Sequence, residues 1–273
     1  GDPHQLLSVG PGNVLPDLLA LGVPHIRLSS YHRQADADSA LAYNVRGFGA
    51  CRSLNDLHFD DSFQFIPMAD DTTIRNCVCR GGINLYRLGA DIQVLSPFNH
   101  SGLLSSASLN VAFRECLNPA TEENTIKDVF FRAGDRVIIQ QNDWEQKVCN
   151  GDIGTYYHKS ADGVLYYSVA CNRDRVAVWG GEGANPLYRL KLAYVITIHK
   201  AQGSEYDTIV LPISKGFANM LHRNLLYTAI SRAKRRVVIV GDPDALTTAL
   251  RREAPPRRSM LVSKTHSAQE FAA

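Results

Sequence analysis

The sequence lacks several features that would assign it to a common class. No apolar run in its 273 residues approaches the ~20 needed to cross a bilayer, and no signal peptide is visible. Its six cysteines are scattered, and the one close pair, Cys77 and Cys79, has the wrong spacing for a zinc knuckle. These absences argue against a membrane anchor and a cysteine-based metal site. We therefore expect no metal ligands in this chain, reduced thiols and a cytoplasmic location.

The sequence also lacks a strong excess of either charge. It has 29 Lys and Arg against 27 Asp and Glu, which gives a net charge of +2 and a pI near 8.2. This mild basicity permits a nucleic-acid partner without establishing one. Basic residues gather late, at 234–236, 251–252 and 257–258, and the alternative interpretation is a set of solvated faces and a tail. An apolar fraction of 45% suffices for a real core, and the length suggests about two domains.

Short apolar strands alternate with amphipathic helices in two separate stretches. The earlier stretch predicts strands at 25–28, 63–67 and 91–97 and helices at 13–21, 39–48, 72–88 and 105–118. The later stretch predicts strands at 205–213 and 235–242 and helices at 221–234 and 244–253. Gly81-Gly82 weakens the prediction of the helix over 72–88. Alternation of this kind is typical of a parallel α/β sheet.

The pattern between these stretches is different. Five short β-runs follow residue 130, and Asn-Gly, Asp-Gly and Gly-Gly pairs punctuate them. Such runs predict a small antiparallel barrel, and because helices return afterwards the barrel is an insertion in the α/β domain. We therefore expect a leading segment at 1–24, an α/β domain at 25–128 and 188–253, an insertion at 129–187 and a tail at 254–273.

Four segments carry more polar chemistry than their neighbours. In GDPHQL (1–6), the Gln5 amide could hold a γ-phosphate oxygen or an attacking water, although a turn with an Asx cap is the alternative. In SSYHRQ (29–34), Arg33 could act on a phosphate held by another domain, or it could be a surface ion-pair partner.

The other two segments lie late in the chain. The strand over 193–197 breaks at Thr197 into a polar turn that contains His199 and Gly203; hydroxyl and imidazole groups can donate to nucleic-acid phosphates, and glycine permits close approach. This turn has more polar groups than an ordinary connection requires. In NLLYTAISRAK (224–234), Arg232 could reach an inter-domain cleft, or it could merely interact with the end of a helix.

Together, and in this order, these segments resemble the C-terminal half of the RecD/TraA-like superfamily 1B DNA helicases, the group that includes the exodeoxyribonuclease V α-subunit. The resemblance spans residues 1 to about 250. GDPHQLLSVGPGN resembles their motif III, SSYHRQ motif IV, IQVLSP motif IVa, ITIHKAQGSEYDTIVLP motif V and LLYTAISRAK motif VI. AGDRVIIQQNDWEQKVCNGDIG resembles the start of their SH3-like subdomain 2B. The resemblance implies a RecA-like domain 2A, the 2B insertion at 129–187 and a remnant of domain 1A at 1–24.

Two motifs of these helicases are missing. The sequence has no Gly-Lys-Ser/Thr and hence no Walker A loop GxxxxGK[ST], and Glu122-Glu123 is in the wrong context for a Walker B pair. In the family both motifs precede motif III and hold ATP and Mg²⁺. We therefore expect this chain to be the C-terminal portion of a longer motor, to need the missing N-terminal half, and not to hydrolyse ATP alone.

The resemblance also assigns roles to individual residues. Catalytic roles fall to Gln5, Arg33 and Arg232, and nucleotide contacts to Gly203 and Glu205. Contacts with single-stranded DNA fall to Thr197, His199 and Ser96, with Gln140, Asn142 and Trp144 as weaker candidates in the insertion. Trp144 could equally belong to the core of the barrel.

Helicases of this family translocate 5′ to 3′, so single-stranded DNA, or duplex DNA with a 5′ overhang, is the expected partner. A membrane is not expected as a partner. Two alternatives stay open: a DNA-binding module without turnover, and a neighbouring helicase type such as a conjugative relaxase-helicase or an RNA helicase. HKAQGSE (199–205) together with a short insertion favours the RecD/TraA-like DNA enzymes.

Overall fold

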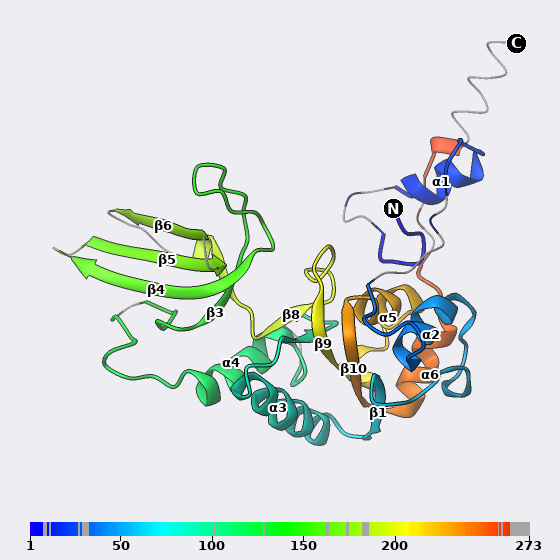
Figure 1. The fold of residues 1–273 in the computed structure, drawn as a ribbon, viewed down its shortest axis with the longest axis horizontal. Coiled ribbons are helices and arrows are strands. Elements are labelled where there is room, and N and C mark those ends of the chain that lie inside the picture. Colours follow the sequence, from blue (N-terminus) through cyan, green and yellow to red (C-terminus); the bar gives the residue numbers. More distant parts are fainter. Residues whose placement is uncertain are drawn as a thin grey trace, which may run out of the picture.

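The structure is a computed structural model, and Figure 1 shows its two separate sheets. It describes residues 1–7, 10, 12–26, 28, 33–100, 102–127, 129–161, 164–172, 175–181, 186–255, 257 and 259–262. The first sheet has five parallel strands in the order β1-β10-β9-β2-β8. Their bounds are β1 Phe63–Pro67, β2 Ile92–Ser96, β8 Val195–Thr197, β9 Tyr206–Ile213 and β10 Ala233–Gly241.

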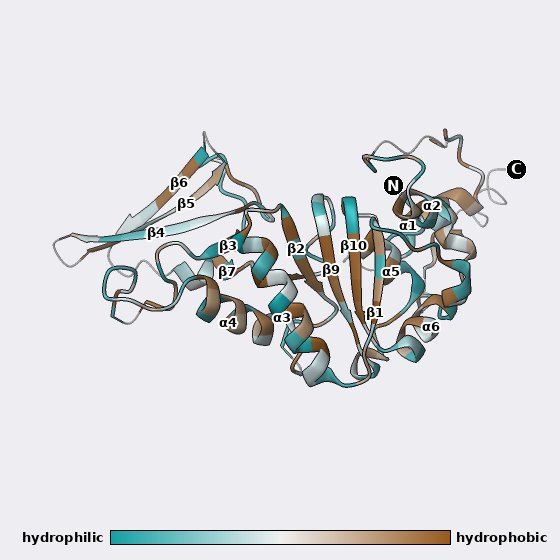
Figure 2. Cartoon of the chain, turned by 60° about the horizontal axis from the view of Figure 1, so that its bottom comes forward, coloured by the Kyte–Doolittle hydropathy of each residue, from teal (hydrophilic) through white to brown (hydrophobic). Residues whose placement is uncertain are grey.

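Helices cover both faces of the parallel sheet (Figure 2), which explains why its strands are apolar along most of their length. Helices α3 and α4 lie on one face, and α2, α5 and α6 lie on the other. The described helices are α1 Val14–Ala20, α2 Ala40–Gly47, α3 Asp71–Arg87, α4 Ser106–Leu117, α5 Arg223–Ile230 and α6 Pro243–Arg251. All five residues of β2 are buried, so the main core lies around the middle of this sheet.

Helix α3 is continuous through the two glycines that weakened its prediction. The Asp70 side chain caps it by accepting a hydrogen bond of 2.9 Å from the Thr73 N–H. A Cβ atom at Gly82 would lie 2.7 Å from Cζ of Phe113 in α4. Gly82 therefore permits close packing of α3 against α4, and this packing compensates for its low helix propensity.

The second sheet is antiparallel and has the strand order β6-β5-β4-β3-β7. Its strands are β3 Arg136–Ile139, β4 Ile153–Ala161, β5 Val164–Asn172, β6 Arg175–Gly181 and β7 Leu190–Leu192. It has a core of its own, which includes Phe131, Val137, Tyr156 and Val169. Strand β7 pairs with β3 and so belongs to this sheet. The insertion therefore runs to residue 192, and the predicted boundary at 187 left its last strand outside it.

Side chains from the two edges of the second sheet meet at Asp143. Its Oδ2 accepts hydrogen bonds from Nε1 of Trp179 in β6, at 2.8 Å, and from Nη1 of Arg189, just before β7, at 3.1 Å. The Arg189 guanidinium also lies 5.6 Å from the centre of the Trp179 ring. The described strands include no β6–β7 pairing, so these side-chain contacts, and not a closed hydrogen-bond ladder, bring the edges together.

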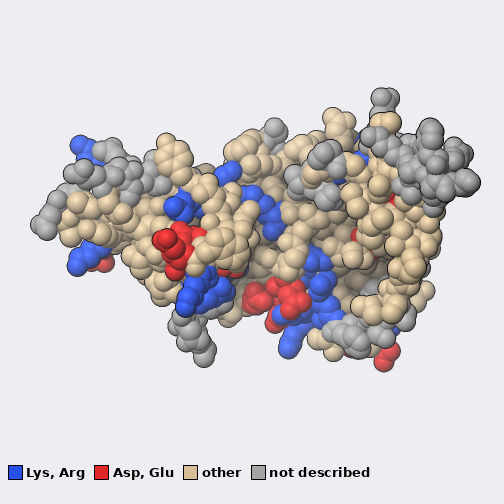
Figure 3. All heavy atoms as spheres, turned by 90° about the horizontal axis from the view of Figure 1, so that it is seen from above, with Lys and Arg blue, Asp and Glu red and all other residues tan. Residues whose placement is uncertain are grey.

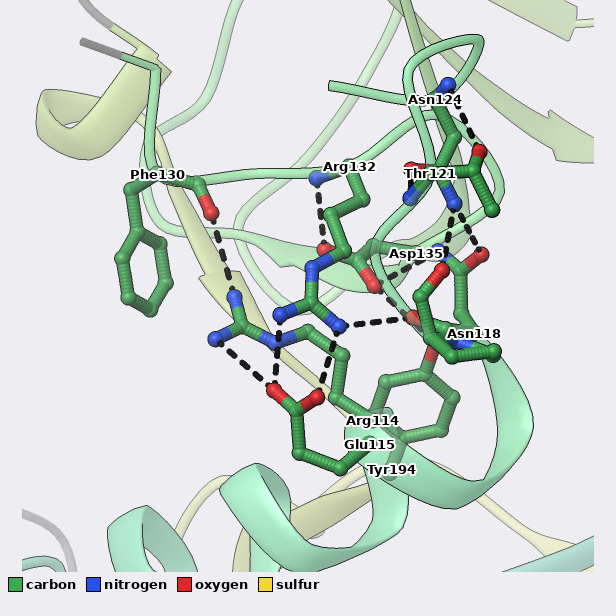
Figure 4. A network of polar contacts seen from close by, with 10 residues as sticks. Arg114, Glu115, Asn118, Thr121, Asn124, Phe130, Arg132, Asp135 and Tyr194 are labelled. Atoms are coloured by element: carbon green, nitrogen blue, oxygen red, sulfur yellow. Dashed lines mark hydrogen bonds and ion pairs between the residues drawn. The ribbon is translucent and has the colours of Figure 1, made fainter. Parts of the chain in front are cut away.

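A buried polar network joins the two sheets where the chain enters and leaves the insertion (Figure 4). Asp135 is fully buried, and its Oδ1 accepts from Nδ2 of Asn118 at 2.9 Å and from the Tyr194 hydroxyl at 3.2 Å. Burial and the Asp135 carboxylate raise the pKa of Tyr194, so the hydroxyl keeps its proton and donates. Arg132 forms a bidentate pair with Glu115 of α4, at 2.7 and 3.2 Å. These contacts hold the chain in place both where it enters the insertion and where it leaves it.

Two predicted elements were wrong. Residues 25, 26 and 28 form no strand, and the Ile26 and Leu28 side chains are 91% and 88% exposed; residue 27 lies outside the described part. None of the described strands pairs with this segment, and a short isolated strand is not stable by itself. The helix predicted over 221–234 ends at Ile230. Ala233 already pairs with Tyr206 as the first residue of β10, so sheet pairing prevails over the helical pattern.

Several predictions fall on residues outside the described part. Among them are residues 29–32 of SSYHRQ, the Asp162-Gly163 turn and residues 263–273 of the predicted tail. Within the part that is described, no helix has the length and apolar character required to span a bilayer. All six cysteines are free thiols.

Candidate nucleotide and nucleic-acid sites

One segment, residues 198–205, runs the length of the parallel sheet and connects two groups of polar side chains. We call it the crossing segment. It starts after Thr197, which lies opposite Ser96 at the carboxyl end of β2. It ends before β9, where Thr208 lies opposite Ile92 at the amino end of β2. Its two ends therefore lie at opposite edges of the sheet.

Gly203 sets the conformation of the crossing segment near its second end. Its φ angle is +87°, in the left-handed region that residues with a Cβ atom rarely adopt. No atom lies within 4 Å of the position that a Cβ would take. The glycine is therefore required by the backbone turn and not by crowding, and the space beside it is open.

Arg232 lies beside the second end of the crossing segment, in the turn between α5 and β10, and is 2% exposed. Its guanidinium donates to the carbonyl oxygens of Thr228 and Ser204, both at 3.2 Å, and to the Ser231 hydroxyl. Among the described residues it forms no ion pair with a carboxylate. Burial and the nearby positive charge of Arg33 lower its pKa. The site thus has a buried positive charge that lacks a paired anion.

Arg33 approaches the same turn from the other side. Its Nη1 donates to the Ser231 carbonyl at 2.6 Å, and its Nε pairs with Oε2 of Glu205 at 3.3 Å. The other oxygen of Glu205 pairs with Nζ of Lys234 at 3.0 Å. Hydrogen bonding from Lys234, followed by the charges of Lys234 and Arg33, lowers the pKa of Glu205, so it stays ionised. Three cations, Arg232, Arg33 and Lys234, thus gather near the carboxylates of Glu205 and Asp2, and an anionic ligand would balance the remaining positive charge.

Residues 1–7 pack against this group, although residues 1–24 were expected to belong with another domain. The Leu6 N–H donates to Oγ1 of Thr228 in α5 at 2.8 Å, and the Leu6 carbonyl accepts from Nε2 of Gln202 at 3.0 Å. The Gln5 amide donates to the Asp2 carboxylate at 3.0 Å. The structure therefore brings the predicted motifs III, V and VI together, with Gln5 held by the Asx-type turn that was its alternative interpretation.

A second group lies at the first end of the crossing segment. His199 is exposed, although packed neighbours partly desolvate its ring and lower its pKa. Nζ of Lys200 donates to Oε1 of Gln140, just after β3, at 2.6 Å. Partial burial and the nearby Lys191 lower the pKa of Lys200 to about 8. Thr197 and Lys200 both line a cavity of about 260 Å³ between the parallel sheet, α4 and the insertion.

Three predicted DNA contacts need revision or refinement. Ser96 is fully buried, and its hydroxyl donates to the carbonyls of Phe98 and Leu104. The prediction of a direct contact between Ser96 and DNA is therefore wrong for this structure, because the hydroxyl is engaged inside the fold. Asn142 is exposed, but its Oδ1 accepts from the Asn150 N–H at 2.8 Å and shapes the loop between β3 and β4. Trp144 is 76% exposed, which excludes the core position that was its alternative.

Two lysines belong to these sites that were not predicted. Lys200 lies in HKAQGSE and Lys234 in SRAK, within segments already singled out, but a lysine in a polar turn is too common to be selected by type. Only their partners Gln140 and Glu205 identify them. The face drawn in Figure 3 carries acidic and basic side chains in adjacent small clusters. The described residues contain no group of His, Cys, Asp and Glu that could hold a metal ion.

Known proteins with similar sequences include a DNA helicase and subunits of the RecBCD enzyme. Residues 192–240 match the UvrD-like helicase C-terminal domain family. The chain is 30% identical over 267 residues to the ATP-dependent RecD2 DNA helicase of Deinococcus radiodurans, covering 97% of this chain and 35% of that protein. It is 28% identical over 271 residues to the RecBCD enzyme subunit RecD of Mycolicibacterium smegmatis, covering 93% of this chain and 46% of that subunit.

A solved structure is also similar in part. The structure of Bacteroides Pif1 bound to single-stranded DNA is 16% identical with a TM-score of 0.44, covering 89% of this chain and 56% of that one. The chain spans about a third to a half of the length of the two curated relatives it matches. In sequence, the chain is similar to RecD-like helicases over nearly its whole length, as its motifs predicted.

Proposed function

We propose that this chain is the C-terminal motor portion of an ATP-dependent DNA helicase that couples ATP hydrolysis to 5′–3′ movement on single-stranded DNA. The observation that carries the proposal is Arg232, a buried arginine that pairs with no carboxylate among the described residues and lies beside Arg33 at one end of the crossing segment. The other end of the same segment carries His199 and Lys200, and Thr197 lies directly before it. In this proposal the parallel sheet is a RecA-like domain 2A and the second sheet an SH3-like subdomain 2B, which the meeting of its edges at Asp143 supports.

The nucleotide side fits the terminal phosphate of ATP. A buried guanidinium whose partners are two carbonyls and a hydroxyl has positive charge available for an anion. Arg232 and Arg33 would stabilise the negative charge that develops on the transferring phosphoryl group, and arginines in this role typically contribute ~10³–10⁵ in rate. Glu205 would break its ion pair with either Arg33 or Lys234 and contact the nucleotide beside Gly203. The Gln5 amide would form a hydrogen bond with the terminal phosphate.

Most of the ATP site would lie in an N-terminal half that precedes this chain. Mg²⁺ would be bound there, because the described residues offer no set of metal ligands. ATP and Mg²⁺ are then cofactors of the whole protein, and this chain alone is inactive. The packing of residues 1–7 on α5 supports a short path from that half to Arg232, since Leu6 contacts both Thr228 and Gln202.

The strand side fits the backbone of single-stranded DNA. Thr197 and His199 would bind phosphates at the first end of the crossing segment, with Lys200 beside them and Gln140 holding Lys200 in place. Asn142 and Trp144 lie on the exposed loop after β3 and would contact the strand where it passes the insertion. Phosphate contacts of this kind make binding strongly dependent on salt.

Coupling follows from the path of the crossing segment. A movement of Arg232 and Ser204 towards a nucleotide displaces one end of the segment, and Thr197 and Lys200 lie at the other. Closing and opening of the nucleotide site would thus move Thr197 and Lys200, which bind the phosphates of the DNA strand. This step needs no contact between nucleotide and DNA.

ATP turnover tests the proposal. The 273-residue chain and the protein in its full natural length are each assayed with and without single-stranded DNA. We expect no turnover by the chain and DNA-stimulated turnover by the full-length protein, which should also unwind a duplex with a 5′ overhang. Absence of turnover in the full-length protein, with strand binding retained, would favour a DNA-binding module, and a preference for RNA would favour a neighbouring helicase type.

A further inference from the structure

The cavity beside Thr197 has the size and lining of a site for one aromatic ring. Its volume is about 260 Å³, below the ~300–1,000 Å³ typical of pockets for whole drug-sized ligands. It lies between α4, β8 and the inserted sheet, and most of its lining is apolar. The residues that shape it include Val111, Phe130, Ile138, Leu190, Leu192 and Ile196.

Phe130 provides a fixed stacking surface in this cavity. Its ring is 48% exposed, while the Arg114 guanidinium lies 4.7 Å from the ring centre. Arg114 is itself held by its hydrogen bond of 3.1 Å to the Phe130 carbonyl, and Figure 4 shows the ring pointing away from the polar network around Asp135. Phe131 packs edge-on against Phe130 with ring centres 5.1 Å apart. The ring is therefore held in place before any ligand arrives.

Positive and neutral polar groups surround the opening, and none of the described residues that line the cavity is acidic. Lys191, Lys200 and His100 belong to the lining. Lys200 has the neutral amide of Gln140 as its partner, and both Lys200 and Lys191 line the cavity, where the charge of Lys191 helps to lower the pKa of Lys200. An apolar, aromatic interior beside two such cations matches the chemistry of a base attached to a phosphate backbone.

We propose that this cavity binds one unstacked base of the DNA strand, with the base on Phe130 and its neighbouring phosphates at Lys191 and Lys200. The inference rests on the proposed function, because the strand must already pass Thr197. The protein would then bind one nucleotide of the DNA strand through its base as well as through its phosphates. Such a contact would favour no particular sequence strongly, because every base has a face that can stack.

Abasic scanning tests this site directly. A single abasic position is moved along a short DNA oligonucleotide, and binding to the full-length protein is measured by fluorescence anisotropy at fixed salt. We expect affinity to fall about tenfold when the abasic position coincides with the cavity, and little elsewhere. Phe130→Ala should remove this positional dip, as should Val111→Trp, which fills the cavity from the exposed side of α4.

Phe59→Ala serves as the matched control. Phe59 is also 48% exposed and has an aromatic neighbour, Phe63, but it lies near β1 and away from the cavity. This variant should keep the dip at full depth. A flat profile in the wild-type protein, or a dip that survives both Phe130→Ala and Val111→Trp, would overturn the base site alone. Failure of the intact oligonucleotide to bind at all would instead contradict the proposed function.

Discussion

The Lys200 ammonium donates a hydrogen bond of 2.6 Å to the side-chain oxygen of Gln140, 60 residues earlier in the chain. This contact ties the crossing segment to the inserted sheet. Near the other end of the segment, Asp152 of the insertion and Glu205 line a common cavity of about 220 Å³. The insertion therefore lies beside the crossing segment near both of its ends. We expect a displacement of this segment to shift the inserted sheet as well as the parallel sheet.

The pKa of Lys200 leads to a prediction about pH. Because burial and Lys191 lower this pKa to about 8, Lys200 loses its proton as the pH rises from 7 to 9. The affinity for single-stranded DNA should therefore fall over this range, by several-fold at constant salt. In Lys200→Arg the charge persists, so the fall should be much smaller.

The control for this experiment is Lys215→Arg. Lys215 pairs with Asp242 and Asp244, away from the crossing segment. In anisotropy titrations at pH 7, 8 and 9, the affinity of this variant for single-stranded DNA should fall with pH as much as that of the wild-type protein. An equal loss of affinity in the wild-type protein and in Lys200→Arg would show that another group titrates.

His222 should make the fold sensitive to acid. Its Nδ1 accepts from the Leu225 N–H and caps α5, and burial with the nearby Arg252 lowers its pKa to about 4 from 6.5. The unfolded chain takes up this proton at the higher pKa, so the free energy of unfolding should decrease as the pH falls from 6.5 to 4.

The variant His222→Asn keeps a capping acceptor but does not titrate. Its free energy of unfolding, measured in urea, should decrease less between pH 7 and pH 4.5 than that of the wild-type chain. His25→Asn, at an exposed position, should behave like the wild type. If His222→Asn loses as much stability as the wild-type chain, the cap is not the acid-sensitive group.

The joint between the sheets should depend on Tyr194. Its hydroxyl donates to the fully buried Asp135 carboxylate, and removal of such a hydrogen bond typically costs ~1 kcal/mol. Tyr194→Phe should lower the free energy of unfolding by about this amount in urea titrations. Tyr157→Phe, at a half-exposed position on β4, should leave it unchanged within error. Equal stability of the two variants would mean that the joint does not depend on this contact.

Much of the parallel sheet could be predicted from local pattern. Strand β1 was predicted with its observed bounds, and β2 and β9 to within one residue at each end. Strand β2 is buried along its whole length, β9 along most of it and β1 in part, so their sequences are mostly apolar. The run at 25–28 also contains two apolar residues, Ile26 and Leu28, but no described strand pairs with it, and only tertiary structure shows this difference.

The candidate sites were predictable in part, for a similar reason. Residue type and order placed Arg33, Gly203, Glu205 and Arg232 in one family of motifs, and the structure brings them around one turn. Burial could not be predicted in the same way. The Ser96 hydroxyl is enclosed by the loop that follows β2. Conversely, the importance of Lys200 depends on Gln140, which local sequence does not place beside it.

The most direct test of the central claim is the rate of DNA-stimulated ATP hydrolysis by the full-length protein carrying Arg232→Ala. Arg232 lies in the nucleotide site as proposed, so we predict that kcat falls ~10³-fold or more, with the affinity for single-stranded DNA retained. Arg235→Ala provides the control, since that side chain is 70% exposed and pairs only weakly with Asp207 at 3.6 Å. Circular dichroism should show that both variants fold. Turnover that is equally fast in wild type, Arg232→Ala and Arg235→Ala would contradict the assignment of Arg232 to catalysis and with it the proposed coupling.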